Sequence, residues 1–118
     1  MKLINLADKF KEFDEPWSPR IVASLNDSYV KLVKLKGEFI WHSHEKEDEL
    51  FLVVKGHLLI EFRDRNLWLE TGELTVIPRG VEHRPVAEEE VQVILIEPNT
   101  TINTGDAQGD RTVEAIWL

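Results

Sequence analysis

Residues 37–56 read GEFIWHSHEKEDELFLVVKG, and this stretch decides the fold. Its centre holds two histidines one residue apart, His42 and His44, followed by Glu49. Because successive side chains of an extended strand point to opposite faces, the His-x-His spacing turns both imidazoles to the same side if a strand carries it. Imidazole nitrogens and carboxylate oxygens are common ligands of transition-metal ions. The stretch therefore predicts a metal site built on β-strands.

Short strands are predicted on both sides of the histidine pair. Residues 30–36 interleave apolar and basic side chains, with a phase break between Leu32 and Val33 that predicts a bulge or a bend. Residues 50–54 form a brief apolar run that ends at a lysine-glycine pair, which favours a strand over a buried helical turn. The acidic segment 45–48 is then the connecting turn.

The same pattern of short strands and turn residues continues along the chain. Leu58, Ile60 and Phe62 share one face of a predicted strand, and the opposite face carries Leu59, Glu61 and Arg63. Residues 91–97 are apolar on both faces apart from a glutamine and a glutamate, which predicts a central strand between two packed layers. Regular short strands with frequent turns predict an all-β sandwich or barrel.

The two ends of the chain depart from this pattern. Residues 5–13 place Leu6, Phe10 and Phe13 at helical spacing, which predicts a short amphipathic helix that two following prolines end. The chain closes on three large apolar residues, 116–118, which we expect to dock on the body or on a second subunit.

Composition limits the possible functions. The chain has 118 residues, predicted to form a single domain, and a formal net charge of -8 without a dense lysine and arginine cluster. Nucleic acid and anionic membranes are therefore disfavoured as partners. No apolar stretch approaches the roughly 20 residues of a membrane span. The first residues lack the features of a secretory signal, and cysteine is absent, so a cytoplasmic location without disulfides is expected.

Two stretches together resemble the motifs of the cupin superfamily. The first, residues 37–56, has a glycine, then His-x-His, then a glutamate, then a glycine seven positions later. The second, residues 72–87, reads GELTVIPRGVEHRPVA and contains a Pro-x-Gly-x-x-His core that ends at His83. The chain resembles small single-domain cupins of the RmlC-like, mannose-6-phosphate-isomerase-like type. The resemblance implies an all-β jelly-roll (double-stranded β-helix) barrel over residues 1–118, with the short N-terminal helix added.

Two positions depart from the family pattern. Four residues separate Gly37 from His42, where the family usually has five. Ala87 stands where the second motif often has an asparagine. Neither change touches the residues that match the metal ligands of the family, although both place the chain outside its strictest pattern.

The resemblance implies one divalent transition-metal ion held by four side chains: His42, His44, Glu49 and His83. Three imidazoles and one carboxylate suit iron, manganese, nickel, zinc or copper, and the affinity order among these ions does not select one. Strand parity further predicts that Ile40 shares the face of the first histidine, while Phe51 and Val53 share the face of the glutamate. These three side chains are the predicted apolar walls of a substrate pocket.

Several other residues invite simpler interpretations. His57 is expected to be a hydrogen-bonded or exposed histidine, and Trp41 should face away from the metal by parity. The acidic run 88–90 is most simply a solvated loop. Arg79 and Arg84 are the nearest candidates in sequence for binding an anionic substrate.

Two functions stay open on this basis. The first is a metal-dependent enzyme of the dioxygenase or isomerase type acting on a small organic molecule, with no dedicated catalytic residue evident except groups near the metal, such as Glu82. The second is a non-catalytic module that binds a small molecule or a sugar. A purely structural role is least favoured. The resemblance also implies a homodimer, since edge strands and an apolar terminus need covering.

Overall fold

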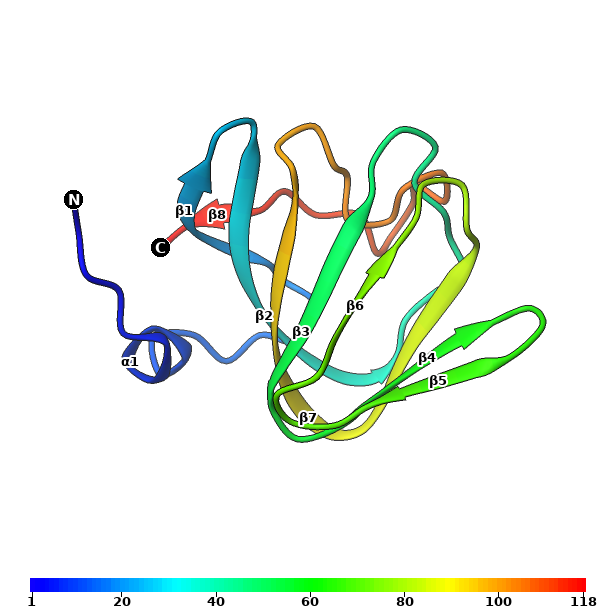
Figure 1. Cartoon of the computed structure of the whole chain (residues 1–118), viewed down its shortest axis with the longest axis horizontal. Helices are drawn as coiled ribbons and strands as arrows, with labels where there is room; N and C mark the ends of the chain where they lie inside the picture. The colour runs from blue at the N-terminus through cyan, green and yellow to red at the C-terminus, as the bar shows by residue number, and fades with distance from the viewer.

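The longest strand, β7 (His83–Pro98), organises the fold of this computed structural model, which describes residues 1–118. One short helix, α1 (Leu6–Phe10), precedes the barrel (Figure 1). The other strands are, in chain order, β1 (Arg20–Leu25), β2 (Ser28–Glu38), β3 (Glu49–Lys55), β4 (Leu58–Phe62), β5 (Asn66–Leu69), β6 (Leu74–Ile77) and β8 (Ile116–Trp117). This is the predicted all-β barrel with a short N-terminal helix. No helix has the length and apolar character needed to cross a membrane.

Strand β7 folds back on itself, so that both of its ends reach the same end of the barrel (Figure 1). Its ladder with β2 is regular from Pro98 to Val91 and resumes only at Ala87, which leaves residues 88–90 as an exposed bulge. On its other edge, one half of β7 pairs with β4 and the other half pairs with β3. The acidic run 88–90 is therefore solvated as expected, but it belongs to a strand and not to a loop.

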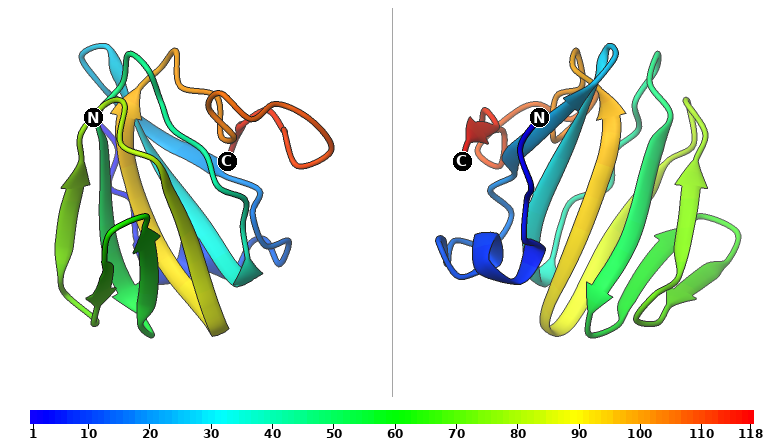
Figure 2. Two further views of the ribbon diagram at one scale, coloured as in Figure 1. Left: turned by 90° about the vertical axis from the view of Figure 1, so that its right-hand side faces the viewer. Right: turned by 60° about the vertical axis from the view of Figure 1, so that its left-hand side comes forward.

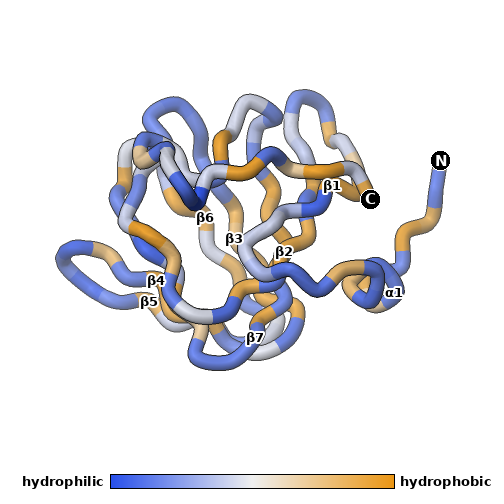
Figure 3. Tube along the Cα trace, turned by 180° about the vertical axis from the view of Figure 1, so that it is seen from behind, coloured by the Kyte–Doolittle hydropathy of each residue, from blue (hydrophilic) through white to orange (hydrophobic).

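Along β2, β3 and β7, the side chains inside the barrel change from apolar to charged. Val33, Val53 and Val93 lie in one buried cluster of twelve residues. Register places Glu49 and Glu97 on this same interior face at one end of the barrel, because Leu50 lies opposite Ile96 in the β3–β7 ladder. Figure 3 shows the apolar segments (orange) along these strands and polar turns (blue) at their ends. The buried polar groups thus gather at one end.

The outward face of β2 and β7 is buried too, beneath the helix. Leu32 and Ile94 pack there against Phe10 and Phe13 in a second cluster. Residues 31–35 of β2 are consequently all buried, on alternating faces. Apolar residues therefore follow one another at Leu32 and Val33 because both faces of the strand are buried. The predicted bulge there is wrong, since the β2–β7 ladder is regular at these residues.

Helix α1 is shorter than predicted. Its N-cap is Asn5, whose side-chain oxygen accepts the backbone N–H of Asp8 at 2.9 Å. It ends at Phe10, well before the two prolines, because the following chain must extend to place the Trp17 N–H against the Lys34 carbonyl oxygen at 2.8 Å. Phe13 is still buried, as its spacing predicted.

The C-terminal segment docks on the body of the protein. Strand β8 pairs parallel to β1, and Figure 2 shows the segment leading to it (orange to red) outside the strand layers. The expected docking is confirmed for the backbone, whereas the side chains of Ile116 and Trp117 are about half exposed. Trp117 packs edge-on against Tyr29, with ring centroids 5.5 Å apart.

Replacing Phe10 tests whether the helix is an integral part of the fold. Its ring is 1% exposed. We expect Phe10→Ala to lower the free energy of unfolding by about 3 kcal/mol, because the substitution removes a buried aromatic ring and leaves a cavity. Leu3→Ala, at a fully exposed site, should change it by less than about 0.5 kcal/mol. Urea unfolding followed by circular dichroism measures both, and equal effects of the two substitutions would contradict the account of this cluster.

Candidate metal centre

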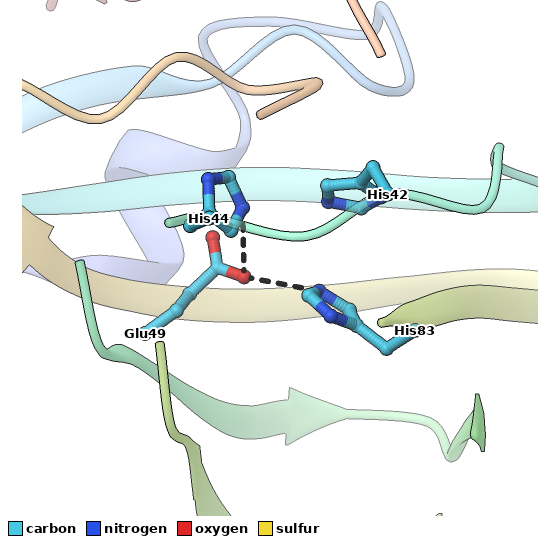
Figure 4. Close-up of side chains that lie close together, drawn as sticks. All are labelled: His42, His44, Glu49 and His83. Carbon is cyan, nitrogen blue, oxygen red and sulfur yellow. Dashed lines mark ion pairs between the residues drawn. The ribbon is translucent and has the colours of Figure 1, made fainter. Parts of the chain in front are cut away.

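Four buried side chains meet at the polar end of the barrel (Figure 4). His42 and His44 lie in the connection between β2 and β3, Glu49 begins β3, and His83 begins β7. One nitrogen or oxygen atom from each lies within 4.8 Å of the others, and no member is more than 4% exposed. The four residues that match the metal ligands of the family are thus brought together.

An antiparallel bridge joins His42 to His83. The backbone N–H of His42 donates to the carbonyl oxygen of His83 at 3.1 Å, and the reverse bond is 2.9 Å. The carbonyl oxygen of His44 accepts the N–H of Gly80 at 2.8 Å. His42 and His44 lie in none of the strands β1 to β8, so the predicted strand over this pair is wrong. The backbone hydrogen bonds just described hold this segment extended instead.

Backbone carbonyl groups fix the orientation of two of the imidazoles. His42 Nδ1 lies 2.9 Å from the oxygen of Ile40, and His83 Nδ1 lies 2.9 Å from the oxygen of Val81. A carbonyl oxygen only accepts hydrogen bonds, so each Nδ1 carries the proton. Each Nε2 is then unprotonated in the neutral ring, which is the form that binds a metal ion.

The facing atoms lack partners within the protein. His44 Nε2, His83 Nε2 and Glu49 Oε1 are buried without a hydrogen bond. The carboxylate oxygen is 3.5 Å from the first of these nitrogens and 3.4 Å from the second (Figure 4). An unpaired buried polar atom costs about 1–3 kcal/mol, so three that face one another form a site that suits a cation.

A divalent ion fits this arrangement. Two ligands held about 2.0–2.2 Å from one ion lie at most about 4.4 Å apart, so the four side chains need only small inward shifts to share one. The ion would pair His44 Nε2, His83 Nε2 and Glu49 Oε1 at once. The donor set is the predicted one of three imidazoles and one carboxylate.

Burial and neighbouring charges shift the pKa values of three of the four groups. Burial, together with the nearby His83, lowers the pKa of His42 to about 4. Burial also opposes ionisation of Glu49, but the adjacent Glu97, His44 and His83 side chains hold the pKa of its carboxyl well below the usual value. For His44, burial is outweighed by Glu49, and the pKa of this imidazole is raised. His44 therefore takes up a proton more readily than His42.

A narrow cavity with a volume of about 40 Å³ adjoins two of the four groups, His42 and Glu49. Of the three predicted wall residues, Phe51 lines it. Val53 lies deeper in the core, and Ile40 is not a lining residue. Phe39 takes that place, stacked on Trp17 with centroids 4.7 Å apart. The alternation of side chains along a strand predicted Ile40 as the wall residue. This prediction is wrong because residues 39–41 are not in a strand.

Several cavity residues were missed from the sequence. Glu97, Trp17 and Asn103 line the cavity beside the predicted ligands. Glu97 is the one charged residue of a run that is apolar except for Gln92, and this exception is the signal that could have revealed it. Its partner Lys31, 66 positions away in sequence, donates to it at 2.9 Å. Burial and the adjacent Glu49 raise the pKa of the Glu97 carboxyl well above its usual value.

The C-terminal segment holds the residue between the two histidines. The Ser43 N–H donates to the Asp106 carboxylate at 2.8 Å, and the Asp106 N–H donates back to the Ser43 carbonyl oxygen at 3.0 Å. Gly105 adopts a φ of +54°, and a Cβ at this position would overlap the same carbonyl oxygen. Only glycine therefore permits this close approach.

The remaining candidates lie away from the cavity. Trp41 faces outward as predicted and carries the Arg63 guanidinium 3.8 Å from its ring centroid. The same arginine binds Glu82 at 2.7 Å on the surface, which removes that glutamate from the metal centre. His57 is exposed as predicted, with its nearest carboxylate oxygen 3.6 Å away.

Neither arginine proposed for an anionic substrate lines the cavity. Arg79 pairs with Asp48 on the surface at 3.2 Å. Arg84 pairs with Glu61 at 2.7 Å and with Glu38 at 3.3 Å. Both guanidinium groups are thus committed to carboxylates outside the cavity.

Several known proteins are similar to this chain in sequence or in fold. Residues 29–99 match the sequence family described as a cupin domain. The uncharacterised protein YdbB of Bacillus subtilis (strain 168) is 37% identical over 83 residues, which cover 70% of this chain and 71% of YdbB. A cupin-2 domain containing protein from Shewanella frigidimarina is 52% identical, with a TM-score of 0.81 over 82% of this chain and 95% of that one. Protein NMB1881 from Neisseria meningitidis is 32% identical, with a TM-score of 0.76 over 83% and 100%. The predicted jelly-roll fold is confirmed.

Acidification should weaken metal binding by protonating His44. Because only the neutral imidazole binds an ion and the pKa of His44 lies above 6.5, protons compete as the pH falls through that raised value. His42, with its pKa near 4, stays unprotonated over the same range. Below the His44 pKa, we expect the apparent Kd for Zn(II) to rise about tenfold per pH unit. A chelator competition titration between pH 8 and pH 5.5 measures this, with His57→Ala as the matched control. A constant Kd over that range would contradict the expectation.

Proposed function

We propose that this chain, which belongs to the cupin family, binds one divalent transition-metal ion and is a metal-dependent enzyme acting on a small organic molecule. The ligands in this proposal are His42, His44, Glu49 and His83. One observation carries it: buried imidazole nitrogens and a carboxylate oxygen face one another without hydrogen-bond partners. Reactions of the dioxygenase or isomerase type are the favoured chemistry.

The donor set supports this reading. Three imidazoles and one carboxylate suit iron, manganese, nickel, zinc or copper, and in a six-coordinate ion they leave positions for a ligand. When bound, such an ion supplies Lewis acidity toward a chelating oxygen or, for a redox metal, a place for dioxygen to react. The protein orients the ligands through the carbonyl oxygens of Ile40 and Val81.

The cavity walls determine what reaches the centre. Phe39, Phe51 and Trp17 present aromatic surface that excludes water, and Asn103 adds one polar side chain. Space for only a few water-sized groups admits the head group of a small molecule and not a polymer segment. The proposed substrate is therefore compact and enters with its chelating end first.

A non-catalytic module that binds a small molecule or a sugar is the second candidate. One observation favours it: the ionisable residues that line the cavity are His42, Glu49 and Glu97, of which two are proposed ligands. Few groups are thus available to move protons during a reaction. Such a module would hold its ligand without turnover.

The proposed partners are a small-molecule ligand and a second copy of the chain, in the cytoplasm. Strand β6 pairs only with β3, so it leaves one edge open. Its Leu74 and Val76 side chains are about half exposed. A homodimer that covers this edge would remove apolar surface from water.

Metal analysis tests the proposal. Protein purified without chelators should contain roughly one transition-metal ion per chain, since the ion satisfies the buried ligands, and inductively coupled plasma mass spectrometry measures this. The His42→Ala/His44→Ala variant should lose the ion, whereas the matched variant His57→Ala should keep it. Wild-type protein that holds no metal and takes up none of the five candidate ions would refute the proposal.

A further inference from the structure

A buried ion pair occupies positions where the barrel elsewhere has apolar side chains. Along the interior face of β7, Val91, Val93 and Leu95 are followed by Glu97, whose side chain is 2% exposed. On β2, the interior residue nearest to it is Lys31, which is 5% exposed and lies opposite Leu95 in the β2–β7 ladder. Its ammonium nitrogen donates to Glu97 Oε1 at 2.9 Å.

This pair is not explained by stability. Removing two charges from water costs several kcal/mol per ion, and apolar residues of similar volume often replace a buried pair without loss. The pair is also incomplete, because Glu97 Oε2 is buried without a hydrogen-bond partner. Lys31 holds one carboxyl oxygen of Glu97, and the other oxygen is available to hydrogen-bond a ligand.

Glu97, which carries this unpaired oxygen, lies beside the proposed metal ligands. It lines the narrow cavity together with His42 and Glu49. The β3–β7 register puts Glu97 beside Glu49 on the interior face, since Leu50 and Ile96 are the adjoining pair. A molecule bound to the proposed ion would therefore have Glu97 next to it.

We infer that Glu97 is a specificity-determining residue, which hydrogen-bonds through Oε2 to a hydroxyl group of the molecule at the metal, and that Lys31 is its positioning residue. This inference rests on the proposed function. It names the substrate class: small chelating molecules with a hydroxyl beside the coordinating oxygen, such as hydroxy acids, hydroxy ketones and polyols. A site built to bind a hydroxyl rejects analogues without it, because its own polar group is then left unpaired.

The charges of the cavity oppose a phosphorylated substrate. Its lining contains two carboxyl groups and no arginine or lysine. Lys31, the nearest buried cation, is engaged by Glu97. A phosphate group beside the proposed ion would meet the Glu49 and Glu97 carboxyl groups, and the lining has no arginine or lysine to pair with it.

Two small ligands separate this hydroxyl contact from simple chelation. Glycolate and methoxyacetate both offer a carboxylate and a second oxygen to a metal ion, but only glycolate has an O–H to donate. Zn(II)-loaded wild-type protein should bind glycolate about tenfold more tightly than methoxyacetate, as isothermal titration calorimetry measures. Equal affinities in the wild type would overturn the inference, whatever any variant does.

The variant Lys31→Met/Glu97→Leu removes the ion pair without leaving a lone buried charge. It should retain its Zn(II), and its preference for glycolate should fall about tenfold, to near equality. A retained preference would overturn the inference while leaving the metal proposal intact. Loss of Zn(II) from this folded variant would also overturn it, since Glu97 would then act on the metal ligands. Failure of the wild type to bind Zn(II) would overturn both proposals.

Discussion

The burial of the Glu49 carboxylate between the Nε2 atoms of two histidines is the constraint on which the rest of the site depends. A carboxylate with an unpaired oxygen is costly inside an apolar barrel, and aromatic walls keep water from reaching it freely. The arrangement is consistent with a bound cation, which would pair the carboxylate and both nitrogens together. His42 and His83, oriented by backbone carbonyl oxygens, direct their Nε2 atoms to the same point.

Long-range contacts assemble this centre more than any single strand does. Strand β7 bends at residues 88–90 and returns to the end of the barrel from which it started, so that His83 and Glu97 both lie beside Glu49. The C-terminal segment fixes Ser43 between the two neighbouring histidines through paired bonds with Asp106. The connection between β2 and β3, strand β7 and the C-terminal segment thus all help to position the four candidate ligands.

The sequence predicted the parts of the site that short spacings encode. The His-x-His pair, Glu49 and His83 belong to motifs whose local geometry is repeated in the structure, and they do converge. Parity failed at Ile40, because the chain there is not a strand and Phe39 takes its place. The role of Lys31 was hidden, since an alternating basic pattern normally indicates a solvated face, and its partner lies 66 positions away. Burial on both faces of β2 depends on a helix packing over it, which no local pattern reports.

Anomalous diffraction from crystals soaked in Zn(II) tests the central claim most directly, because it locates the ion independently of activity. The account predicts one strong peak per chain, bound by the Nε2 atoms of His42, His44 and His83 and by the Glu49 carboxylate. Zinc found only at surface carboxylates, with ordered water hydrogen-bonded among the four buried side chains instead, would contradict it.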